Sequence, residues 1–175
     1  AWLAPVLVFT MEEVWLERNP GDTSSVHTRT FPEVPSEWRD DGLAAKWAKI
    51  RAVRRVVTGA LEIERKNKVI GSSLEAAPIV AITDPELAKA VESHDLAELC
   101  IVSAISTQSH AFSNEQFFKL DEVPGVQVAF ARAAGTRCAR SWKVSPEVGS
   151  DPEYPDLTPR DAQAMRERVA AGLSV

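Results

Sequence analysis

The stretch from residue 36 to residue 67 constrains the fold most, because its apolar side chains recur at the spacing of one long amphipathic helix. At 3.6 residues per turn these side chains fall on a single face. The pattern predicts a helix from Ser36 to about Asn67 that stops before Gly71. The apolar face consists of Leu43, Ile50, Val53, Val57, Ala60 and Leu61.

Charge is distributed unevenly along the chain. The net charge is -5, so a wholly basic nucleic-acid-binding domain is excluded and any contact with nucleic acid needs a local patch. Between Lys46 and Lys68, however, eight Lys or Arg residues stand against only Glu62 and Glu64. Two interpretations remain open: a solvated helix face, or contact with RNA phosphates, for which the arginine fork is suited. The candidate phosphate contacts are Arg51, Arg54, Arg55, Arg65 and Lys66.

On either side of this helix the residue pattern is different. Thr10 and Glu13 have the spacing of a capping box and predict an earlier helix from Met11 to about Arg18. After Gly71, β-branched and apolar runs predict strands, and Asp84-Pro85 and Thr158-Pro159 predict helix starts. The expected strands cover residues 74–82, 100–107 and 126–133, and the expected helices cover residues 85–99, with a break near His94, and 159–171.

We therefore expect an α+β fold. A partial helical bundle of long antiparallel helices is predicted over residues 1–70. A small mixed α/β domain with a C-terminal helix is predicted over residues 71–175.

The segment from Arg137 to Trp142 has the form of a zinc knuckle without its metal. Cys138 and Cys100 are the only cysteines, so a site with four thiolate ligands is impossible. What is left is a basic hairpin with an aromatic residue, and single-stranded RNA bases stack on aromatic rings and guanidinium planes. The alternative is that Trp142 belongs to a small core. The candidate RNA contacts here are Arg137, Arg140, Trp142 and Lys143.

Catalytic motifs are missing from the sequence. The three histidines lie in separate segments, and neither a phosphate-binding glycine loop nor a nucleophile elbow is present. No apolar run has the length of a membrane span, and two unpaired cysteines are typical of the reducing cytoplasm. The chain begins at Ala1 without an initiator methionine, so we expect a segment of a longer protein.

Several segments together resemble one family. Leu3 to Trp15 is similar to a helix of the anticodon-binding domain of class I aminoacyl-tRNA synthetases. Ser25 to Pro35 and Ile70 to Ala76 are similar to segments of the isoleucyl-tRNA synthetases of bacteria, and Arg137 to Trp142 lies where that family often has a C-terminal zinc knuckle. Read in order, these segments cover nearly the whole chain, which therefore resembles the C-terminal part of a bacterial isoleucyl-tRNA synthetase.

This resemblance implies a function and a set of partners. The chain is expected to bind the anticodon stem-loop of isoleucine tRNA for a cytoplasmic, monomeric enzyme. The catalytic and editing domains, with ATP and Mg²⁺, are expected elsewhere in the same protein. The alternative is a structural brace with little affinity for RNA, in which Trp2, Trp15 and Trp47 pack against a bundle that the chain only partly contains.

The resemblance also bears on the knuckle. In members that bind zinc, cysteines occupy the positions of Ser141, Thr158 and Asp161, so only Cys138 remains of four ligands. We therefore expect no zinc here. In place of the second pair of metal ligands, a capping box from Thr158 to Asp161 is expected to hold this part of the knuckle by helix capping.

Overall fold

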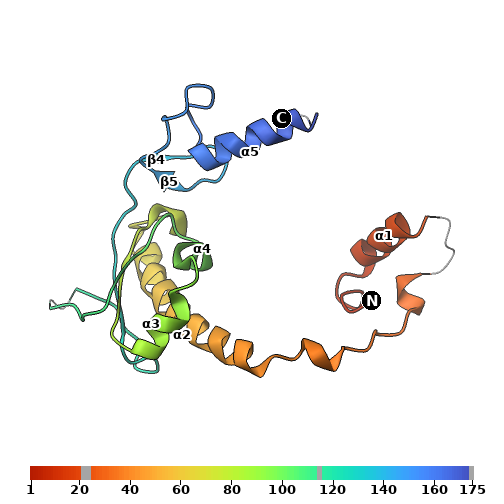
Figure 1. The fold of residues 1–175 in the computed structure, drawn as a ribbon, viewed down its shortest axis with the longest axis horizontal. Helices are drawn as coiled ribbons and strands as arrows, with labels where there is room; N and C mark the ends of the chain where they lie inside the picture. The colour runs from red at the N-terminus through yellow and green to blue at the C-terminus, as the bar shows by residue number, and fades with distance from the viewer. Residues whose placement is uncertain (21–24, 114–115, 174–175) are drawn as a thin grey trace. The chain divides into compact units, whose positions relative to one another are not determined.

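The computed structural model describes residues 1–20, 25–113 and 116–173. The chain forms two compact units, Ala1–Asp41 and Gly42–Val175, and its mixture of helices and strands confirms the α+β class (Figure 1). The helices are α1 (Val8–Arg18), α2 (Asp41–Lys66), α3 (Pro85–Val91), α4 (Leu96–Cys100) and α5 (Pro159–Ala170). The strands are β1 (Ile79–Ile82), β2 (Ser106–Gln108), β3 (Val126–Ala129), β4 (Thr136–Arg137) and β5 (Val144–Ser145).

The first unit contains α1, which starts earlier than the sequence predicted. The N–H of Met11 donates to the carbonyl of Leu7 at 2.9 Å, so Thr10 lies inside the helix and does not cap it. Glu12 instead accepts hydrogen bonds from the Ser25 hydroxyl at 2.8 Å and the Val26 N–H at 2.9 Å. No residue of α1 is buried in this chain, and Trp2 is 49 % exposed.

In the second unit, the apolar face of α2 forms the centre of the core. Ile50, Val53 and Val57 are fully buried, as the sequence periodicity predicts. Val56 is buried as well, although it was not predicted, and the predicted Leu43 is 50 % exposed.

The helix begins at Asp41 and not at Ser36, since Ser36–Trp38 forms a separate 3-10 turn, and it ends at Lys66, before Gly71. Lys68 adopts a left-handed conformation there, and the N–H of Val69 closes the last turn on the carbonyl of Glu64.

A three-stranded sheet with the order β2-β1-β3 contributes the rest of this core. β1 is antiparallel to β3, with Val80 opposite Val128, and parallel to β2, with Val80 opposite Thr107. The parallel pair requires a crossover, which α3 and α4 supply. All three strands are shorter than the sequence predicted.

The crossover confirms the predicted break near His94, because α3 ends at Val91 and Asp95 caps the start of α4. Cys100 lies at the end of α4 and not in a strand, although it is buried as expected. Burial raises the pKa of the Cys100 thiol to about 11, so this group remains protonated.

The compact units divide at residue 41, whereas the sequence placed a domain boundary at residue 70. The reason is that α2 shares its core with the sheet, and Trp47 packs against the same cluster of buried side chains. Because α1 and α2 belong to different units, the antiparallel helix packing stays a prediction, as does the functional division after residue 70.

Strands β4 and β5 and helix α5 enclose a second, smaller core of Cys138, Leu157 and Ala162. Gly135 precedes β4 with a φ of 109°, and a Cβ there would lie 2.2 Å from the backbone carbon of Ser145. Only glycine fits, because backbone atoms cannot yield as a side chain can. None of the helices in the described residues is both long enough and apolar enough to span a membrane.

The shared core makes a prediction about stability. Val57→Ala should lower the free energy of unfolding of the second unit by roughly 2 kcal/mol, because it leaves a cavity between α2 and the sheet. The exposed Val169→Ala on α5 is the matched control and should change it by less than about 0.5 kcal/mol. Urea unfolding would measure both, and an unchanged midpoint for Val57→Ala would contradict the shared core.

Candidate nucleic-acid interface

The five candidate residues on α2 lie on one side of the helix, with Arg51, Arg55 and Lys66 roughly opposite its buried face and Arg54 and Arg65 on the flank. At 3.6 residues per turn they fall within an arc of about 120°, and from first to last they extend about 22 Å along the axis. All are exposed. This surface, called here the basic face, consists of Arg51, Arg54, Arg55, Arg65 and Lys66.

Two members of the basic face have partners within the protein. Arg65 forms an ion pair with Glu62 at 2.7 Å, on the same helix. The Nε of Arg54 donates a hydrogen bond of 2.6 Å to the carbonyl of Leu99, near the end of α4. Arg54 therefore also satisfies the C-terminal end of a neighbouring helix, a role that sequence analysis did not foresee.

The knuckle is a hairpin in which β4 and β5 pair antiparallel, with Arg137 opposite Val144. Its loop is closed by the N–H of Cys138 on the carbonyl of Lys143 at 2.9 Å and by the N–H of Trp142 on the carbonyl of Cys138 at 3.0 Å. Trp142 has a φ of 64°, which is rare for a bulky residue and is more often found at functional sites.

The side chain of Trp142 is not part of a core. It is 58 % exposed, and the guanidinium of Arg137 lies over its ring at 5.3 Å from the centroid. The stacked pair therefore presents an aromatic surface and a positive charge together, which is the chemistry that binds unstacked bases.

One carboxylate holds the hairpin to α5. Asp161 is only 6 % exposed, and it accepts hydrogen bonds from the Cys138 thiol at 3.2 Å, the Thr158 hydroxyl at 2.8 Å and the Arg140 guanidinium at 2.8 Å. Ser141 donates another hydrogen bond to it. The N–H of Asp161 in turn donates to the Thr158 hydroxyl at 3.3 Å, which caps α5 as the sequence predicted.

Three of the four side chains that the resemblance aligned with a zinc site, those of Cys138, Ser141 and Thr158, thus surround the fourth, the carboxylate of Asp161. Among the described residues no group of three or more His, Cys, Asp or Glu side chains could hold a metal ion. The expectation that zinc is not bound stays a prediction. Burial by itself would raise the pKa of Asp161, but the hydrogen bonds from Ser141, Thr158, Cys138 and Arg140 outweigh it and hold that pKa well below its usual range.

Helix α4 lies beside α2 (Figure 1), and its C-terminal half contacts one residue of the basic face and one residue of the hairpin. Glu98 accepts from Lys143 at 3.3 Å and from Arg160 at 3.0 Å, and the next residue, Leu99, binds Arg54. Sequence reasoning missed Glu98 and Arg160. No linear signal could have revealed them, because Glu98 is 45 residues from Lys143 and 62 from Arg160.

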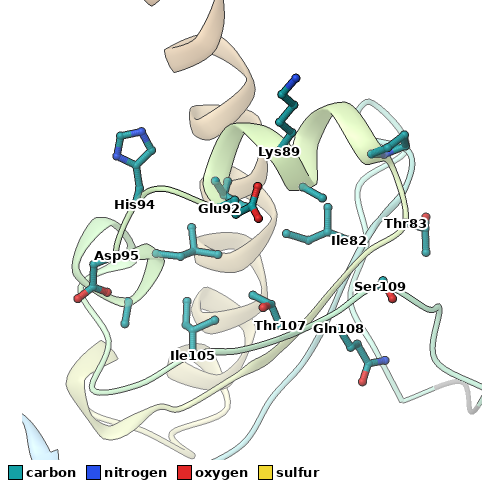
Figure 2. A pocket seen from close by; sticks show the side chains of 15 residues that line it. Ile82, Thr83, Lys89, Glu92, His94, Asp95, Ile105, Thr107, Gln108 and Ser109 are labelled. Carbon is teal, nitrogen blue, oxygen red and sulfur yellow. The ribbon is translucent and has the colours of Figure 1, made fainter.

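A groove of about 850 Å³ lies on another part of this unit, between α3, the turn before α4 and the ends of β1 and β2. Figure 2 shows Ile82 and Ile105 facing the groove, whereas Lys89 points away from it. The ring of His94 packs against Trp47, with 5.5 Å between ring centroids. The groove contains none of the candidate RNA contacts.

The Asp161 cluster predicts a pH dependence of stability. The pKa of Asp161 in the folded protein lies below its unfolded value of about 3.9. Its ionised form therefore adds to the free energy of unfolding in full above about pH 4, and this stabilisation is lost as the pH falls further. Asp161→Asn should cost roughly 2–4 kcal/mol at pH 7 and much less at pH 2. Urea unfolding across this range tests it, with the exposed Asp156→Asn as the control. An equal cost at both pH values would contradict the prediction.

Known proteins match this chain in sequence. Residues 1–81 match the family described as the anticodon-binding domain of tRNA ligase. The isoleucine–tRNA ligases of Brucella abortus (strain 9-941) and Agrobacterium fabrum are 56 % and 55 % identical to the chain over 98 % and 97 % of its length. That of Bradyrhizobium diazoefficiens is 52 % identical over 99 %.

The chain spans about 17 % of the length of each of these relatives. Identity above one half over nearly the whole chain shows that the chain belongs to the isoleucine–tRNA ligase family, as a segment that overlaps the anticodon-binding domain.

Proposed function

We propose that this chain forms part of the surface with which an isoleucine–tRNA ligase binds the anticodon stem-loop of isoleucine tRNA. The whole enzyme would attach isoleucine to this tRNA with ATP and Mg²⁺, through domains outside the chain. The observation that carries the proposal is that α4 contacts one candidate residue from each of two segments far apart in the sequence: Arg54 of α2 binds the Leu99 carbonyl, and Lys143 of the hairpin pairs with Glu98.

The basic face of α2 would contact the RNA backbone. Its side chains are exposed and lie on one side of α2, and the opposite side of this helix is buried in the core. Such contacts position an RNA without reading its sequence, because every nucleotide carries the same phosphate. Arg51, Arg55 and Lys66 suit this role better than Arg54, which already binds the Leu99 carbonyl.

The hairpin would contact bases. Trp142 and Arg137 form an exposed stack, and Lys143 and Arg140 lie next to it in the same loop. Arg140 is held by Asp161, so its guanidinium is ordered before RNA arrives. Preordered side chains lose less conformational entropy on binding.

The basic face predicts a change in salt dependence. Arg55→Gln and Lys66→Gln should each weaken binding of an anticodon stem-loop RNA and make the plot of log K against log salt shallower by about one unit. Cognate and non-cognate RNAs should be affected alike. Lys49→Gln is the control, because Lys49 lies on another side of α2 and binds Glu86 at 2.7 Å. Fluorescence anisotropy measures all three variants, and an unchanged slope would remove the basic face from the interface.

For the hairpin we expect a loss of affinity without a change in salt dependence. Trp142→Ala should weaken binding of the cognate stem-loop by roughly ten- to a hundredfold, the value of about one stacked base, and leave the salt slope unchanged. Trp142→Phe keeps an aromatic ring at the same backbone position and should retain most of the affinity. Equal affinities of Trp142→Ala and the unchanged chain would mean that the hairpin does not contact bases.

A further inference from the structure

Glu98 lies between basic side chains that come from two other parts of the fold. Its Oε1 accepts hydrogen bonds from Lys143 of the hairpin at 3.3 Å and from Arg160 of α5 at 3.0 Å. The Glu98 side chain is 49 % exposed, and that of Arg160 is 78 % exposed. The group that holds these two cations is therefore open to solvent.

A pocket of about 440 Å³ adjoins this ion-pair network, between the hairpin, the first turn of α5 and the body of the second unit. Three of its lining residues are cations: Arg132, Lys143 and Arg160. The acidic lining residues are Glu147 and Asp161, and the carboxylate of Asp161 already accepts hydrogen bonds from several donors. Arg132 forms an ion pair with Glu75 at 3.6 Å. The cations that could turn to an anion with several oxygen atoms are therefore Lys143 and Arg160, whose shared acceptor Glu98 is half exposed.

We propose that this pocket binds one phosphate of the RNA through Lys143 and Arg160. While no RNA is bound, the carboxylate of Glu98 accepts the hydrogen bonds of these two side chains instead of the phosphate. The proposal rests on the proposed function. A carboxylate and a phosphate both accept hydrogen bonds from cations, so the two side chains can exchange one acceptor for the other. The exchange is easy because ion pairs at an exposed surface contribute little stability.

Glu98 is not needed to hold the surrounding structure together. Helix α4 is capped by Asp95, whose carboxylate accepts from the N–H of Glu98 at 3.0 Å, and Leu96 and Cys100 anchor it in the core. The hairpin is joined to the body by the N–H of Val144, which donates to the Ser103 hydroxyl at 2.7 Å. Glutamine at position 98 has the same shape and a similar helix propensity, so the fold should be retained.

The test is the affinity of Glu98→Gln for the anticodon stem-loop RNA across a range of salt concentrations. The variant should bind roughly three- to tenfold more tightly than the unchanged chain at low salt, with a steeper salt slope, because two cations no longer have to leave a competing carboxylate. The matched control is Glu86→Gln. Glu86 forms an equivalent exposed ion pair with Lys49, away from the pocket, and its loss should change nothing.

A second comparison separates this proposal from a general effect of charge. In a Lys143→Gln/Arg160→Gln background, the tightening caused by Glu98→Gln should disappear, because the cations that it releases are gone. Tightening that persists in this background, or affinity that is equal or weaker in Glu98→Gln alone, overturns the proposal.

Inorganic pyrophosphate provides a readout that does not depend on the RNA. Titrated into the chain, it should shift the amide NMR signals of Lys143 and Arg160 at lower concentration in Glu98→Gln than in the unchanged chain. If this holds while neither protein binds RNA, the pocket is confirmed as an anion site and the proposed function fails. If RNA binds but neither ligand gains affinity in the variant, the proposed function stands and the role of Glu98 is rejected.

Discussion

The packing of α2 against the three-stranded sheet is the contact on which the rest of the second unit depends. Ile50, Val53 and Val57 are fully buried in it, which fixes the rotation of the helix about its own axis. Once that rotation is fixed, the basic face must point to solvent, because it lies on the other side of the same helix. Burial of apolar side chains, at about 25 cal/mol per Å², thereby orients charges that contribute little to stability themselves.

A second constraint acts on the hairpin, which is too small to have a large core. Zinc-bearing proteins join such hairpins to a neighbouring segment with one metal ion and four ligands. Here a buried carboxylate joins Cys138, Thr158 and Arg140 from the hairpin and the start of α5. The arrangement differs from a metal site in one functional respect: Arg140 is both a partner of the buried charge and an exposed cation, since its side chain is 49 % exposed. The residue that helps to hold the hairpin to α5 is therefore also one of the candidate RNA contacts.

Much of this architecture could be predicted from residue patterns, because the responsible interactions are local. The apolar periodicity of α2, the Asp84 and Thr158 caps and the break before α4 all act within a few residues. Where the predicted element was wrong, a contact that the pattern did not include determined the local structure. Thr10 has the spacing of a cap, but the turn from Leu3 to Leu7 starts the helix first. The strand predicted around Cys100 is a helix end, because Asp95 caps α4 just upstream.

The sequence by itself determined which residues are candidates for an RNA-binding surface: the cations of α2, the basic and aromatic residues around Cys138, and a cysteine count too small for a site of four thiolates. That Trp142 is exposed and not part of a core was decided by the tertiary structure. Only the tertiary structure decided how those residues combine. It bound Arg54 to Leu99, brought Lys143 and Arg160 to a single carboxylate on α4, and gathered the other three knuckle positions around Asp161. The physical reason is that such contacts join residues far apart in the chain, and the burial of the core, rather than any local pattern, brings them within hydrogen-bonding distance.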